Sequence, residues 1–221
     1  MSVTSRWRLV LARVVGAAVA VGSVLGVGLV SLPAASAGAT AAPGSGFWLV
    51  GQDGGVFAFG SAAYLGGPNT VPPDVCMAPV ATAPIDCAGI AATPDGHGYW
   101  LVGMDGGVFA YGDAAFYGSM GGRPLNAPVG GIAPTADGRG YWLVSWDGGV
   151  FAFGDATFAG SMGGRPLNAL MMGIARNPDG PGYWTVGQDG GVFAFGGAPF
   201  LGSMADHVPA VQPVFAIAAS G

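Results

Sequence analysis

An eight-residue segment, Asp-Gly-Gly-Val-Phe-Ala-Phe-Gly, occurs four times in this chain of 221 residues, once with Tyr in place of the second Phe. The copies begin at Asp53, Asp105, Asp147 and Asp189, at intervals of 52, 42 and 42 residues. A repeat of about 40–45 residues is typical of β-propeller blades, which bury their apolar faces only against each other. The repeat therefore predicts a series of similar packed units.

Within one repeat, 131–164, four short segments rich in aromatic and branched residues alternate with turns: "GIAPT", "YWLVSW", "VFAFG" and "ATFAGSM". The turns between them contain Asp-Gly, which adopts positive φ at little cost. Each segment is predicted to be a strand, so that one repeat forms a four-stranded antiparallel blade. In "YWLV" both faces of the strand are apolar, which predicts burial on both sides by neighbouring blades.

The two ends of the repeat region complement each other. The first repeat begins at Phe47 with the sequence of a second strand, and the last residues, 214–221, match a first strand. We expect an all-β propeller of about four blades. Pairing of the N- and C-terminal strands is expected to close the ring, because closure removes exposed strand edges. The alternative is a four-unit piece that completes a ring by dimerising.

The N-terminal residues have the features of a secretory signal peptide. Three arginines precede an apolar run over 14–32, and small residues end at Ala37, where cleavage is expected. The domain organisation is then a signal peptide at 1–37, a short linker at 38–46 and the propeller at 47–221. An uncleaved anchor is the alternative, because the run approaches spanning length. We expect a secreted protein, extracellular or associated with the cell wall, with no membrane contact after cleavage.

The charged residues exclude two classes of partner. The chain contains no Lys and no Glu, and residues 38–221 carry four Arg against 12 Asp. Nucleic-acid phosphates require clustered basic side chains, and anionic lipid surfaces attract the same groups. We therefore expect no nucleic-acid partner and no binding to anionic lipid by charge.

Cys76 and Cys87 are the two cysteines of the chain, and both lie in the residues that lengthen the first repeat. In a secreted protein a disulfide between them is expected. It would stabilise the Pro-rich insert by roughly 3 kcal/mol. A metal or redox pair is the alternative, which the ten intervening residues and the lack of a neighbouring His disfavour.

The sequence predicts no catalytic residue, no metal site and no cofactor. His97 occupies a turn position where other repeats carry Arg139 or Pro181, and His207 lies in a degraded loop. One Asp per Asp-Gly-Gly turn is too few oxygens for Ca²⁺. An Asp-based hydrolase is the remaining catalytic alternative. It would require Asp residues from different repeats to meet in a pocket with shifted acidities.

Three residues are candidate ligand contacts. Trp146 precedes one Asp-Gly-Gly turn, where the other repeats carry Gln or Met, and an exposed aromatic can stack on a sugar ring or anchor a protein contact. Arg123 and Arg165 occupy equivalent places in "GGRPLN". They can pair with Asp113 and Asp155, or hold an anionic group of a cell-wall polymer.

The segment "GSMGGRPLNAPVGGIAPTADGRGYWLVSWDGGVFAFGDA" resembles a repeat of secreted and cell-surface proteins of actinobacteria, and the likeness covers 47–221. The resemblance implies a place at the cell surface, where this repeat accompanies cell-wall hydrolase domains or forms long arrays. The first and last repeats depart from the pattern between the third strand and the next repeat. We expect a non-catalytic module that binds a cell-envelope glycan or a surface protein; the alternative is a structural or adhesion module, including one that self-associates.

Overall fold

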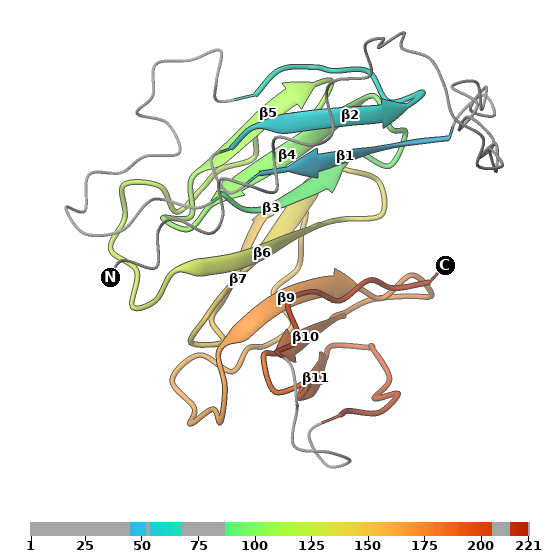
Figure 1. Cartoon of the computed structure of the whole chain (residues 1–221). Helices are drawn as coiled ribbons and strands as arrows, with labels where there is room; N and C mark the ends of the chain where they lie inside the picture. The colour runs from blue at the N-terminus through green and yellow to red at the C-terminus, as the bar shows by residue number, and fades with distance from the viewer. Residues whose placement is uncertain (1–44, 52–53, 68–86, 205–212, 221) are drawn as a thin grey trace, which may run out of the picture. The chain divides into compact units, whose positions relative to one another are not determined.

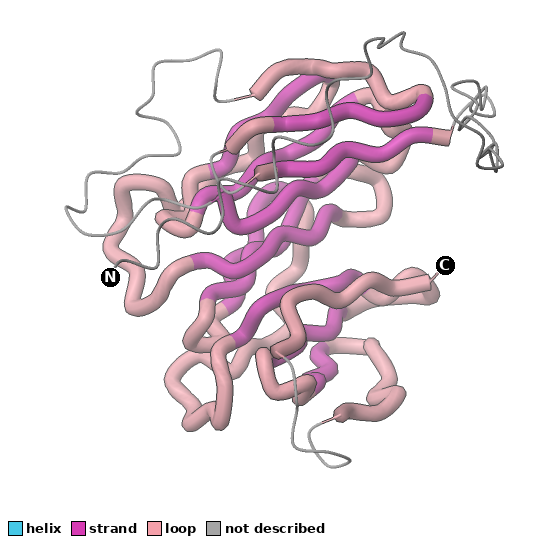
Figure 2. The backbone as a smooth tube through the Cα atoms, viewed as in Figure 1, coloured by secondary structure: helices cyan, strands magenta, loops and turns pink. Residues whose placement is uncertain are grey.

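A computed structural model of the chain describes residues 45–51, 54–67, 87–204 and 213–220. These residues form an all-β structure of four separate antiparallel sheets, and they contain no helix that could cross a membrane (Figures 1 and 2). The predicted signal peptide, most of the linker, Cys76 and His207 lie outside the described residues. The disulfide between Cys76 and Cys87 therefore stays a prediction.

The first sheet has two strands and each of the others has three, in the same order along the chain. The strands are β1 (Gly46–Val50) and β2 (Val56–Gly60); β3 (Cys87–Ala92), β4 (Gly98–Gly103) and β5 (Val108–Gly112); β6 (Val129–Pro134), β7 (Gly140–Ser145) and β8 (Val150–Gly154); and β9 (Met171–Arg176), β10 (Tyr183–Gly187) and β11 (Val192–Phe195).

In the three-stranded sheets, the Asp-Gly-Gly segments form the turns that join the second and third strands. The Asp147 carboxylate accepts a hydrogen bond from the Gly149 backbone N–H at 3.1 Å, and Gly148 between them has a φ of 81°. The same bond is 2.8 Å at Asp105 and 2.9 Å at Asp189. A carboxylate that bonds the backbone two residues on is ordinary turn chemistry, which confirms the structural role predicted for this motif.

The hydrophobic core lies between successive sheets. Tyr141 and Leu143 of β7 pack against the second sheet, whereas Trp142 and Val144 of the same strand pack against the fourth. All four side chains are buried. The prediction that this strand is buried on both faces is therefore confirmed, and each sheet depends on its neighbours for its apolar contacts.

The first strands of successive sheets lie side by side, with β6 between β3 and β9 (Figure 1). Glycine permits this close approach: a Cβ atom on Gly131 would lie 3.4 Å from the Cα atom of Gly173. The C-terminal segment 213–220 continues the series beside β9. Its Val214 N–H donates to the Gln188 carbonyl at 2.9 Å, as Met171 N–H donates to Trp146 in the preceding sheet. Segment 213–220 thus occupies the place of a further first strand.

The fourth strand predicted in each repeat is wrong, since residues 156–162 form no strand. Side chains bind the backbone groups that a ladder would use. The Trp142 indole donates to the Thr157 carbonyl at 2.9 Å, and the Tyr183 hydroxyl accepts from Ala159 N–H at 3.2 Å. Gly160, with a φ of 126°, also departs from an extended conformation. This segment therefore connects to strands of its own sheet and of the next sheet through side-chain hydrogen bonds.

Closure of the ring within one chain is not seen in the described residues. There, β1 pairs with β2 alone, and no other strand lies on its second edge. Segment 213–220 lies beside β9, at the other end of the series of sheets (Figure 1).

Candidate functional site

The principal candidate site is a hollow of about 640 Å³ beside the Asp-Gly-Gly turns of the third and fourth sheets. We call it the Trp146 hollow. The β7–β8 turn, the β8–β9 connection, the β10–β11 turn and the β5–β6 connection all contribute to it. Its lining residues are Asn126, Trp146, Asp147, Gly164, Arg165, Leu167, Asn168, Ala169, Leu170 and Gln188.

The backbone of Trp146 forms hydrogen bonds with two neighbouring segments of the chain. Its N–H donates to the Pro128 carbonyl at 2.8 Å, and its carbonyl accepts from the Met171 N–H at 2.9 Å. The indole lies directly against Gly130, because a Cβ atom there would come within 2.9 Å of the ring. The side chain is half-buried. Trp146 is therefore a fixed aromatic surface that remains partly open to solvent.

Polar side chains complete the Trp146 hollow. Arg165, Asn126 and Asn168 are exposed, and Gln188 is half-buried. The backbone N–H of Gln188 donates to the Leu170 carbonyl at 2.8 Å, which fixes the two connections relative to each other. Amide and guanidinium groups supply both donors and acceptors to a polar ligand. The hollow combines these groups with one aromatic ring.

The structure brings together two of the three predicted ligand contacts. Trp146 and Arg165 line the same hollow, whereas Arg123 belongs to the equivalent connection one repeat earlier and does not. Neither arginine forms an ion pair in the described part of the chain, where the pairs are Asp95–His97 and Asp137–Arg139. Of the two roles predicted for Arg165, pairing with Asp155 is therefore not observed.

Sequence reasoning missed the amide side chains of the Trp146 hollow. Asn126 and Asn168 close the two copies of "GGRPLN", and Gln188 occupies in the fourth sheet the position of Trp146 in the third. The two Asn residues belong to a repeated motif, but that motif does not show that neighbouring repeats bring them and Gln188 into one hollow.

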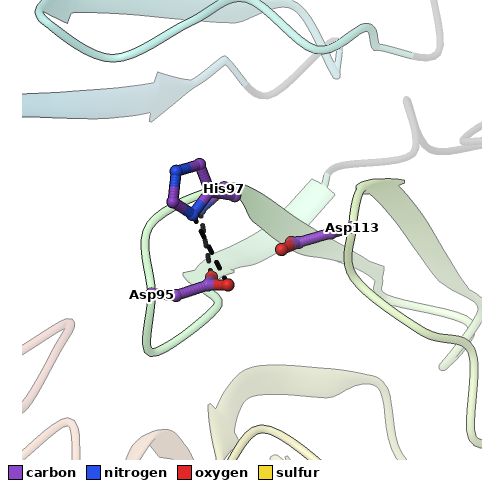
Figure 3. A group of neighbouring side chains, drawn as sticks. All are labelled: Asp95, His97 and Asp113. Carbon is purple, nitrogen blue, oxygen red and sulfur yellow. Dashed lines mark hydrogen bonds and ion pairs between the residues drawn. The ribbon is translucent and has the colours of Figure 1, made fainter.

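A second cluster joins Asp95 and His97 of the β3–β4 turn with Asp113, which follows β5; ligand atoms of the three residues fall within 4.8 Å of one another (Figure 3). The His97 Nδ1 atom is 3.5 Å from the Asp95 carboxylate. The Thr93 hydroxyl donates a hydrogen bond to the Asp95 carboxylate at 2.7 Å. The backbone N–H of His97 donates to the same carboxylate at 3.1 Å. The hydrogen bond from Thr93 is the main cause that lowers the pKa of Asp95 well below its usual value.

The third repeat contains the same arrangement with a different cation. Arg139 replaces His97, and its Nε atom lies 3.8 Å from the Asp137 carboxylate. Thr135 donates to Asp137 at 3.0 Å. The hydrogen bond from the Arg139 backbone N–H is the main cause that lowers the pKa of Asp137. Either basic residue can accompany the aspartate, so the shared role of this position is to support the turn.

Carboxylates from two repeats meet in one pocket of about 190 Å³, lined by Asp95 and Asp113 of the second repeat and Asp137 of the third. A hydrolytic pair of carboxyl groups requires one member to remain protonated near neutral pH, through a raised pKa. The pKa values of Asp95 and Asp137 are instead lowered. Neither group is suited to act as a general acid.

Comparison with models of known protein families gives no match to this chain. A search of curated proteins gives no match either. The function must therefore be argued from the geometry of the chain itself.

Proposed function

We propose that this protein is a secreted, non-catalytic module that binds a glycan of the cell envelope in the Trp146 hollow. The observation that carries the proposal is that Trp146 and Arg165 lie in one hollow with three amide side chains from different repeats. Asn126 and Gln188 come from the two neighbouring repeats and reach the hollow only because the sheets stack.

The chemistry of the Trp146 hollow suits a carbohydrate. The indole offers a flat apolar surface on which the carbon-bound hydrogens of a sugar ring can stack. Asn126, Asn168 and Gln188 can donate to and accept from hydroxyl groups, and Arg165 can bind a carboxylate or phosphate on the polymer. A few directed polar groups around an apolar surface are typical of small-ligand sites.

A non-catalytic role is favoured by the acidic groups. Asp95 and Asp137, which converge from two repeats, have lowered pKa values and accept hydrogen bonds from their own turns. They lack the proton that a general acid must supply. The Asp147 carboxylate in the Trp146 hollow is likewise engaged by the Ser145 hydroxyl at 2.5 Å.

We further propose that the sheets are blades of a β-propeller and that the protein acts outside the cell. The side-by-side first strands β3, β6 and β9 support the first proposal. The predicted signal peptide and the resemblance to actinobacterial surface repeats support the second.

The test is retention of the purified protein on insoluble cell-wall sacculi from which attached proteins have been stripped. Trp146→Ala should reduce retention at least about tenfold, as expected for a central aromatic contact. Met104→Ala is the matched control, because Met104 holds the equivalent position in the second sheet. Arg165→Gln and Arg123→Gln form a second pair, of which only Arg165→Gln should weaken retention. Equal retention of both members of each pair, or retention only on unstripped walls, would refute the glycan site.

A further inference from the structure

We propose that copies of this chain associate head to tail, with β1 and β2 of one copy stacking on β10, β11 and segment 213–220 of another. The inference does not depend on the glycan site, which lies elsewhere. The two end surfaces resemble the surfaces that meet at the junctions inside the chain.

Every interior junction has the same aromatic contact. A tryptophan of one sheet packs on a tyrosine of the next: Trp48 on Tyr99 at 5.3 Å, Trp100 on Tyr141 at 5.7 Å and Trp142 on Tyr183 at 5.4 Å between ring centroids. The three tyrosines are buried at 0% exposure. The tyrosine position of the first sheet is held by Phe47, which is 55% exposed. The first sheet therefore exposes to solvent the surface that is buried in the other three sheets.

The exposed surface of the first sheet is wholly apolar. Phe47 stacks on Phe59 with ring centroids 5.2 Å apart, as Tyr183 lies on Phe195 at 5.6 Å. Leu49 and Phe57 extend the same face and are also exposed. In the third sheet the residues equivalent to Phe47 and Leu49 are buried against the second sheet. We call Phe47, Leu49, Phe57 and Phe59 of the first sheet the front face.

The other end of the series has a hollow where such a face would fit. This C-terminal hollow has a volume of about 320 Å³ and is lined by Trp184, Leu201, Gly202 and the C-terminal residues Ile217–Ser220. Trp184 is the tryptophan equivalent to those of the interior junctions; it is 7% exposed and lines the hollow. Leu201 is 79% exposed. The hollow thus offers the partner surface that Phe47 lacks.

Gly202 provides a second, independent sign of a missing unit. Equivalent glycines have an aromatic ring of the next sheet against them: an added Cβ would lie 2.7 Å from Phe153 at Gly118, and 2.9 Å from Phe195 at Gly160. Gly202 has the same φ as Gly160, 126°, yet no described atom lies within 4 Å of that position. Phe59 of another copy is the equivalent ring.

The strand count also leaves each end incomplete in a complementary way. Each three-stranded sheet contains a first strand, whereas β1 pairs only with β2 among the described strands. Segment 213–220 lies in the place of a first strand but has no second strand beside it in the described residues. By the register of β6 with β7, where Pro134 opposes Tyr141, Ala219 would oppose Phe47.

A second copy is the occupant that the observations favour. Within one chain, the sheet of β1 and β2, which carries the front face, and the sheet of β9, β10 and β11, which borders the C-terminal hollow, lie at opposite ends of the series of sheets (Figure 1). Contact between different surfaces of identical copies is heterologous. Further copies can extend such an assembly into a filament or close it into a ring. An exposed apolar face with an open strand edge readily accepts such a partner.

The test is sedimentation of the purified protein over a range of concentrations, with charge introduced separately at each end. The unaltered protein should form dimers or larger species as concentration rises. Phe47→Asp and Leu201→Asp should each weaken association at least about tenfold. Phe116→Asp is the matched control, since Phe116 is 60% exposed and lies on neither end surface.

Mixing the two charged variants distinguishes a head-to-tail contact from any other. Phe47→Asp retains its C-terminal hollow, and Leu201→Asp retains its front face, so an equimolar mixture should form a one-to-one dimer that neither forms alone. Each variant is checked for folding by near-ultraviolet circular dichroism. A monomeric unaltered protein, or a mixture that stays monomeric, would overturn the proposal.

Crosslinking tests the strand register. A Phe47→Cys variant mixed with an Ala219→Cys variant should crosslink through a short thiol-specific reagent, because directly opposed residues have Cβ atoms about 5 Å apart. The double variant, diluted until it is monomeric, should not crosslink within itself. A crosslink inside one diluted chain would show self-closure and refute association between copies.

Discussion

The Tyr183 hydroxyl donates a hydrogen bond to the carbonyl oxygen of Gly160 at a distance of 2.6 Å, and so ties the fourth sheet to the connection that follows the third. Tyr141 makes the same bond to Gly118, also at 2.6 Å. Tyr99 repeats it with Gly66. Each junction between sheets therefore combines an apolar contact with one hydrogen bond that fixes the position of the neighbouring backbone.

Replacement of Tyr141 by Phe tests this bond. It leaves the Gly118 carbonyl and the Tyr117 N–H without the hydroxyl that both contact. The free energy of unfolding should fall by about 1–3 kcal/mol, the cost of partly buried groups losing their partner. Chemical denaturation measures the change, with exposed Tyr64→Phe as the control. A loss no larger than that of the control would show that the bond adds no stability.

Phe47→Tyr tests the same bond at the proposed junction between copies. The added hydroxyl can reach Gly202 of another copy, as Tyr183 reaches Gly160. One net hydrogen bond should tighten association roughly two- to tenfold without changing the stability of an isolated copy. Sedimentation provides the measurement. Unchanged association would contradict the expected equivalence of Phe47 and Tyr183.

Gly160 and Gly202 permit a matched comparison, because both have a φ of 126° and only Gly160 has a ring against it. Alanine at either position should incur backbone strain of roughly 1–3 kcal/mol. At Gly160 an added methyl group would also press on Phe195, 2.9 Å away, which should cost about 1–3 kcal/mol more. Thermal unfolding at a dilution where the protein is monomeric should rank Gly160→Ala as the less stable variant. Equal effects would show that the junction yields without cost.

At alkaline pH the buried tyrosines should make the fold less stable. Burial raises the pKa values of Tyr99, Tyr141 and Tyr183 above 10.0. Above pH 10.0 the unfolded chain releases protons that the folded chain retains, so the free energy of unfolding falls as pH rises. The chain contains no Lys to obscure the transition. Tyr141→Phe should reduce this pH dependence; an unchanged slope would contradict the assignment.

At acid pH the turn carboxylates should have the opposite dependence. The pKa values of Asp95 and Asp137 are lowered from 3.8 by hydrogen bonds, so their contribution to stability is present above that pH and is lost as pH falls below it. Denaturation at a series of pH values should give a shallower acid slope for Asp95→Asn. The acid slope of Asp179→Asn is measured for comparison, because Asp179 holds the equivalent turn position in the fourth repeat. Parallel slopes for Asp95→Asn and the unaltered protein would exclude a role for Asp95 in acid sensitivity.

The sequence alone determined the repeated units, the strands that flank the Asp-Gly-Gly segments and the turns between strands. Asp-Gly-Gly sets a tight reversal through local backbone preferences, and the two apolar faces of "YWLV" require a neighbour on each side. These are short-range effects, which a local pattern encodes directly. The predicted fourth strand was wrong because residues 156–162 bond to Trp142 and Tyr183, and that choice depends on which side chains arrive from elsewhere.

Only the tertiary structure decided what the units present to a partner. The motif indicated Trp146 and Arg165, yet stacking of neighbouring sheets placed them in one hollow with Asn126 and Gln188 and left Arg123 outside it. Stacking likewise buried Tyr183 and left the equivalent Phe47 exposed. Similar local sequences therefore acquire different roles, because burial is set by which neighbour a unit has, and in the described residues the first and last sheets each have a neighbouring sheet on one side only.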